Sequence, residues 1–66
     1  MEPSEIWELI VKADESLKYA TGDAAGPRRE KAMELLRSAL EEAEAISNDA
    51  LAEQARTRLK DLEGKS

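Results

Sequence analysis

The sequence predicts an all-α fold: one domain over residues 1–66, built as a three-helix antiparallel bundle. Helix-forming residues dominate, with eleven alanines and eight leucines. Apolar residues recur at the three- and four-residue spacing of amphipathic helices. No stretch alternates apolar and polar residues as a half-buried strand does. Two turn-rich segments, residues 21–27 and 47–49, divide the chain into three helices.

The first helix is expected over about residues 4–21. Pro3 and Ser4 suit its start, as a first helical residue or an N-cap. Gly22 and Asp23 end it. Its core face carries apolar residues at helical spacing: Ile6, Leu9, Ile10, Ala13, Leu17 and Ala20.

The second helix is expected over residues 27–46, with Pro27 at its first position. Its apolar stripe has an alanine centre and two bulky flanks, and covers about 160° at roughly 100° per residue. The centre is Ala32, Ala39 and Ala43; the flanks are Met33, Leu36 and Leu40 on one side, and Leu35 and Ile46 on the other. A stripe this wide predicts a central helix with the other two packed on it, at least one of them closely.

The third helix is expected over residues 49–62, with Asn48 or Asp49 as its N-cap. Gly64 stands where the residue after a helix end is expected. The turn that precedes this helix is short, which predicts an antiparallel hairpin of helices two and three. Its apolar face is formed by Leu51, Ala55, Leu59 and Leu62.

Composition excludes several classes of protein. The chain has no Cys and no His, which argues against a small disulfide scaffold and excludes a Cys/His zinc site or a His-dependent triad. The net charge of −5 disfavours nucleic-acid binding. No apolar run approaches the roughly 20 residues of a membrane span, and no signal peptide opens the chain. We therefore expect a soluble cytoplasmic protein without a membrane partner.

Three short motifs are weak as chemical sites. The tail "GKS" has Leu59 where a phosphate-binding loop needs Gly, and it lacks the flanking strand and helix. The cluster "EEAEA", residues 41–45, is interpreted as a solvated helix face rather than an acid–base site. "TGDAAG" lacks the alternating oxygen ligands of a calcium loop. We expect no enzyme activity, no cofactor and no metal.

The candidate partner-binding residues are Trp7, Val11, Arg28 and Arg29. Trp7 and Val11 are one helical turn apart and project outside the core face of helix one. They form either an exposed apolar surface for a partner or a part of the core that helix three covers. Arg28 and Arg29 oppose the dipole of helix two. They either pair with Asp23 or Glu30, or form a small basic surface for an acidic partner peptide.

Part of the chain resembles a tetratricopeptide repeat. Ala32, Leu36 and Ala39 match the small–large–small spacing of the second helix of that repeat. Trp7 and Ile10 match large residues of its first helix, whereas Val11 and Asp14 stand where the family prefers Gly and an aromatic residue. The run "ALAEQARTRLKDL", residues 50–62, is similar to the helix that closes a repeat array. The match covers about half of the chain and implies a tetratricopeptide-like helical hairpin.

The order of three helices also resembles the microtubule-interacting and trafficking domain, which binds partner helices in grooves between its own helices. Both resemblances imply a protein-binding module, and neither carries a catalytic residue onto this chain. The expected function is protein–protein interaction or oligomerisation, with another protein or a second copy as partner. The alternatives are a nucleic-acid-associated helical hairpin and a designed helical bundle without natural function.

Overall fold

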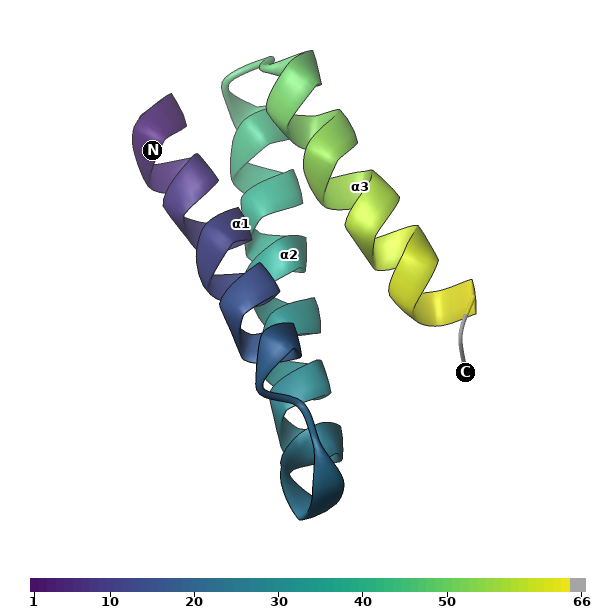
Figure 1. The fold of residues 1–66 in the computed structure, drawn as a ribbon. Helices are drawn as coiled ribbons and strands as arrows, with labels where there is room; N and C mark the ends of the chain where they lie inside the picture. The colour runs from purple at the N-terminus through teal and green to yellow at the C-terminus, as the bar shows by residue number, and fades with distance from the viewer. Residues whose placement is uncertain (65–66) are drawn as a thin grey trace.

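The chain folds into three α-helices and one short 3₁₀ helix, as the computed structural model shows for residues 1–64 (Figure 1). The helices pack together, which confirms the all-α, three-helix fold class. Lys65 and Ser66, which belong to the predicted "GKS" tail, lie outside the described residues. In chain order the elements are α1 (Pro3–Lys18), η1 (Gly22–Ala24), α2 (Ala25–Ala45) and α3 (Asp49–Gly64).

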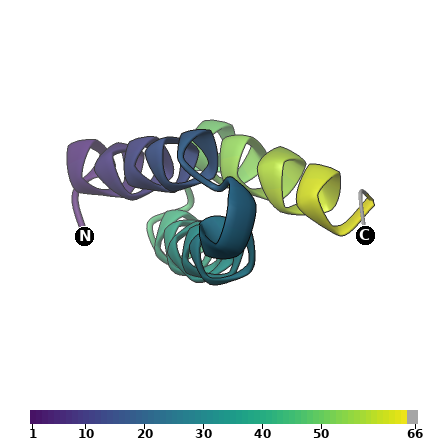
Figure 2. The ribbon, with the colours of Figure 1, turned by 60° about the horizontal axis from the view of Figure 1, so that its bottom comes forward.

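Helix α2 is central. Both α1 and α3 pack along it, and they contact each other only slightly. Figure 2 shows α1 and α3 side by side in one layer, with α2 beneath them. This arrangement confirms that helix two has two neighbours. The two sides of α1 that lie next to its α2-facing side are therefore largely not covered by another helix.

The core is small and rich in alanine. Leu36, Ile6 and Ile10 are its largest fully buried side chains, and the alanine stripe Ala32, Ala39 and Ala43 is completely buried between the helices. Small side chains let helix backbones approach closely, so each remaining large side chain makes more dispersion contacts. The other buried residues are Ala13, Ala52, Ala55, Leu59 and Leu62.

Helix α1 ends at Lys18, earlier than the expected Thr21. The Ala20 and Thr21 N–H groups bond to the carbonyls of Leu17 and Tyr19, 3.1 and 3.0 Å away, so the chain turns tightly here. Gly22 then adopts a φ of +56°, a conformation that L side chains rarely adopt. At the start of the helix, Pro3 is the first residue and Ser4 forms no cap.

Helix α2 begins at Ala25, two residues before the predicted start, so Pro27 is its third residue. Proline is tolerated there because N–H groups of the first turn have no acceptor within the helix. The short helix η1, which precedes it, was not predicted. Helix α2 ends at Ala45 rather than Ile46.

A tight turn joins α2 to α3. Ser47 takes a φ of 55°, and the N–H of Asn48 donates to the Ala43 carbonyl at 2.8 Å, which closes the end of α2. Asn48 is the N-cap of α3, because its Oδ1 accepts a 3.1 Å hydrogen bond from the Leu51 N–H. Helix α3 continues through Gly64, past the expected end at Leu62.

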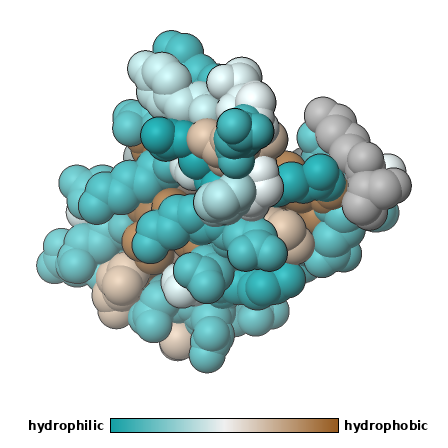
Figure 3. Space-filling view, turned by 90° about the horizontal axis from the view of Figure 1, so that it is seen from below, coloured by the Kyte–Doolittle hydropathy of each residue, from teal (hydrophilic) through white to brown (hydrophobic). Residues whose placement is uncertain are grey.

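Figure 3 views the molecule from the end that carries η1. Hydrophilic side chains cover most of this end, and apolar surface shows mainly in the recesses between them. Among residues 1–64, none of the helices is both long enough and apolar enough to cross a bilayer.

Candidate functional site

Trp7 and Val11 form an exposed apolar surface on α1, which we call the Trp7–Val11 surface. They retain 44% and 36% of their accessible area, although Ile6 and Ile10 on the same helix are completely buried. Of the two alternatives left open by the sequence, the structure has the exposed surface, and helix three does not cover these residues. The physical reason is that α3 rests on α2 and makes few contacts with α1.

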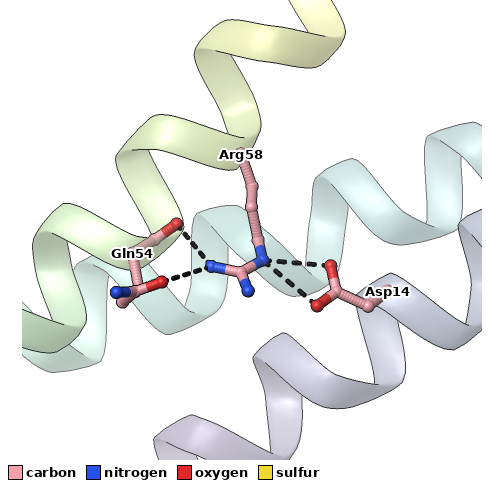
Figure 4. Close-up of polar contacts among 3 residues, drawn as sticks. All are labelled: Asp14, Gln54 and Arg58. Atoms are coloured by element: carbon pink, nitrogen blue, oxygen red, sulfur yellow. Dashed lines mark hydrogen bonds and ion pairs between the residues drawn. The ribbon is translucent and has the colours of Figure 1, made fainter.

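Arg58 of α3 lies beside the Trp7 ring. It also joins α3 to α1 through Asp14 (Figure 4). Its Nε donates to both carboxylate oxygens of Asp14, at 3.0 and 3.2 Å. Its Nη1 donates to the backbone and side-chain oxygens of Gln54, at 3.1 and 2.7 Å. The guanidinium carbon lies 5.8 Å from the centre of the Trp7 ring, within cation–π range. One arginine of α3 therefore contacts both Asp14 and Trp7 of α1, at the edge of the Trp7–Val11 surface.

The side chains of Arg28 and Arg29 lie on different sides of α2. Arg29 is half-buried, and its Nη2 donates to the Leu62 carbonyl in the last turn of α3. The positive charge of Arg29 therefore lies at the negative end of the α3 dipole. This favourable interaction offsets the unfavourable interaction of Arg29 with the positive end of the α2 dipole. Arg28 is exposed, and its own carbonyl accepts a 2.8 Å hydrogen bond from the Ser16 hydroxyl.

The expected pairing of these arginines with acidic neighbours is not found. Among residues 1–64, no ion pair joins Arg28 or Arg29 to Asp23 or Glu30. The two arginines do not form one basic surface either, because Arg29 contacts α3 and Arg28 lies on the α1 side of α2. Arg28 instead lines a hollow of about 470 Å³ between α1 and α2.

A second hollow, of about 400 Å³, lies among α1, α2 and α3. Its charged lining is balanced, with Arg29 and Arg58 against Asp14 and Asp61. Arg58 and Arg29 are already engaged with Asp14 and with the Leu62 carbonyl. This hollow therefore offers little uncompensated charge to a ligand.

The glutamates of "EEAEA" lie at the surface. Glu41 and Glu44 are exposed, and Glu44 forms a 3.8 Å ion pair with Arg56. Glu42 is half-buried and lies 3.8 Å from the amino group of Met1. Within the described part of the chain, no polar or charged residue is buried and no three acidic side chains are arranged to hold a metal ion.

No protein-family model, curated protein or solved structure matches this chain.

The sequence indicates Trp7 and Val11 but not the residues that surround them. Asp14 and Arg58 are 44 residues apart in the chain, and nothing in the local sequence of either pairs it with the other. The same holds for Arg29 and the Leu62 carbonyl, which are 33 residues apart. Only the packing of α1 and α3 on α2 brings these groups together.

Proposed function

We propose that this chain is a non-catalytic protein–protein interaction module that binds through the Trp7–Val11 surface. The observation that carries the proposal is the exposure of Trp7, the single tryptophan of the chain. Tryptophan is enriched among the residues that dominate binding energy, and burying it in a partner removes a large apolar area from water. The core closes without Trp7, so the side chain is free to serve a contact.

Arg58 supports this proposal because its hydrogen bonds order a side chain beside Trp7 before a partner binds. Its contacts with Asp14 and Gln54 restrict the guanidinium beside the Trp7 ring. A partner that covers Trp7 then meets a side chain that is already ordered, which lowers the entropic cost of binding. Arginine is also enriched in interfaces.

A tetratricopeptide-like arrangement of an antiparallel bundle is the second part of the proposal. The order α1, α2, α3, with α1 and α3 on one side of α2, is compatible with a helical hairpin followed by a closing helix. Ala32, Leu36 and Ala39 of α2 supply the small–large–small spacing on which the resemblance rests. In this proposal the partner is another protein or a second copy of the chain.

Analytical ultracentrifugation over a range of concentrations tests self-association first. If the partner is a second copy, the mass rises with concentration and Trp7 emission shifts to the blue as its ring becomes buried. The double variant Trp7→Gln, Val11→Gln should then remain monomeric with unchanged helix content. Tyr19→Gln is the control, since Tyr19 is an aromatic residue with 58% exposure at the other end of α1.

If the chain is monomeric throughout, the partner is a different protein, and site-specific cross-linking tests it. A photoreactive amino acid at position 7 should give a defined cross-linked product in a cell extract, whereas the same group at exposed position 45 should not. Identical products from positions 7 and 45, or none from either in a monomeric protein, would contradict the proposal.

A further inference from the structure

The hollow between α1 and α2 has an apolar floor and a basic rim, and we call it the basic hollow. Half-buried Leu9 and Leu35 form the floor. The rim carries Lys12 from α1, and Arg28 and Lys31 from α2. At roughly 100° per residue, Leu9 and Lys12 lie on the flank of α1 opposite the Trp7–Val11 surface. The basic hollow is therefore a separate feature of the molecule.

Within residues 1–64, none of Lys12, Arg28 and Lys31 forms an ion pair with a carboxylate. Arg56 and Arg58, by contrast, are paired with carboxylates on α2, α3 and α1. Glu15 is the acidic residue of the lining. Three cations against one carboxylate give the basic hollow a local positive excess in a chain whose net charge is −5.

Tyr19 adds an aromatic side chain at one end of the basic hollow. It is the single tyrosine of the chain and is 58% exposed. The Lys18 ammonium lies 5.9 Å from the centre of its ring, so a further cation stands beside the lining. The surface thus offers apolar, aromatic and cationic groups together.

We infer that the basic hollow binds an acidic peptide segment of a partner protein, in which an apolar side chain is flanked by Glu or Asp. Leu9, Leu35 and Tyr19 would contact the apolar side chain, and Lys12, Arg28 and Lys31 would pair with the carboxylates. Charge complementarity selects this occupant. A nucleic acid has no apolar side chain for the floor, and the net charge repels its extended phosphate backbone.

Fluorescence anisotropy with a short fluorescein-labelled peptide of Leu and Glu tests the inference. The matched peptide has Gln in place of Glu. The Glu peptide should bind more tightly, and added salt should weaken it because the charges are exposed. Lys31→Glu should weaken binding roughly tenfold, since it replaces an attraction by a repulsion of similar size. Arg28→Gln should weaken it less, because it removes one attraction and adds no repulsion.

Lys60→Glu is the matched control. It makes the same change in net charge at an exposed position on α3, outside the basic hollow. It should leave the affinity within about twofold, because Lys60 does not line the basic hollow and salt screens an exposed charge that does not contact the peptide. Far-UV circular dichroism should show unchanged helix content for both lysine variants.

Proton NMR gives a direct readout of the site, because one tyrosine and one tryptophan mark opposite flanks of α1. The Glu peptide should shift the Tyr19 ring signals and leave the Trp7 indole signal unmoved. Peptide binding should also survive Trp7→Gln, Val11→Gln, so this inference and the proposed function fail separately.

Several results would overturn the inference. These are equal affinity for the Glu and Gln peptides, a loss from Lys60→Glu as large as that from Lys31→Glu, or a peptide-induced shift of Trp7 instead of Tyr19. Tighter binding of single-stranded DNA or of anionic lipid vesicles than of the Glu peptide would assign the hollow to a different class of ligand. A dimer that Lys31→Glu dissociates would assign it to a second copy.

Discussion

Replacing Ala43 by Leu tests the close packing on which the fold depends. Ala43 lies in the alanine stripe of α2 and has no accessible area. Leu adds three carbon atoms to a site with no room, which forces the helices apart or the side chain out of its preferred rotamers. Overpacking of this kind typically costs about 1–3 kcal/mol in the free energy of unfolding. A domain of 66 residues has a total of roughly 3–10 kcal/mol, so the loss is a large share of it.

Thermal unfolding followed by far-UV circular dichroism measures this cost. A loss of 1 kcal/mol lowers the Tm of a domain of this size by roughly 4–8 °C, so a fall of at least about 4 °C is expected. Ala45→Leu is the control: Ala45 is exposed on the same helix, and Leu is also a good helix former, so its Tm should hardly change. Equal Tm values for the two variants would refute the close packing of α2.

Two further predictions concern backbone conformation and charge at helix ends. Because Gly22 and Ser47 both have positive φ, Gly22→Ala should lower the free energy of unfolding by about 1–2 kcal/mol, and Ser47→Gly should raise it by up to about 1 kcal/mol, as urea titration will show. Opposite signs in either variant would contradict the conformations described. Arg29→Gln should cost about 0.5–1.5 kcal/mol through the lost bond to the Leu62 carbonyl, whereas Arg28→Gln should cost little; equal losses would contradict the different roles of these arginines.

The fold was predictable because its main determinants are local. Three amphipathic segments and two turns are visible in the sequence, and the wide stripe of α2 indicates a helix with two neighbours. Helix ends were less predictable. Pro27 fits any position of a first helical turn, so it does not mark the residue at which α2 begins. Gly22 permits a positive φ without requiring it, so the η1 turn was missed.

Some features of the candidate sites were also predictable from the sequence, and others were not. The projection of Trp7 and Val11 outside the core face is contained in the sequence, but their exposure depends on α3 resting on α2 rather than on α1. The divergence of Arg28 and Arg29 was also accessible, since consecutive helical residues point about 100° apart. The alternative in which they form one basic surface therefore conflicts with helix geometry, whereas the absence of the pairing with Asp23 or Glu30 is seen only in the structure of residues 1–64.

The remaining contacts depend on how the helices lie along one another. Lys12 lines the same hollow as Arg28 and Lys31 because α1 and α2 pack at one particular register. The sequence of either helix alone does not specify that register. The same packing explains why α1 presents two different surfaces. In a bundle in which each helix contacts both others, α3 would cover one flank of α1. Here α3 rests on α2, so the apolar flank with Trp7 and the basic flank with Lys12 both face solvent. One helix can therefore carry two separate contacts, and a charge reversal on one flank should leave the other unaffected.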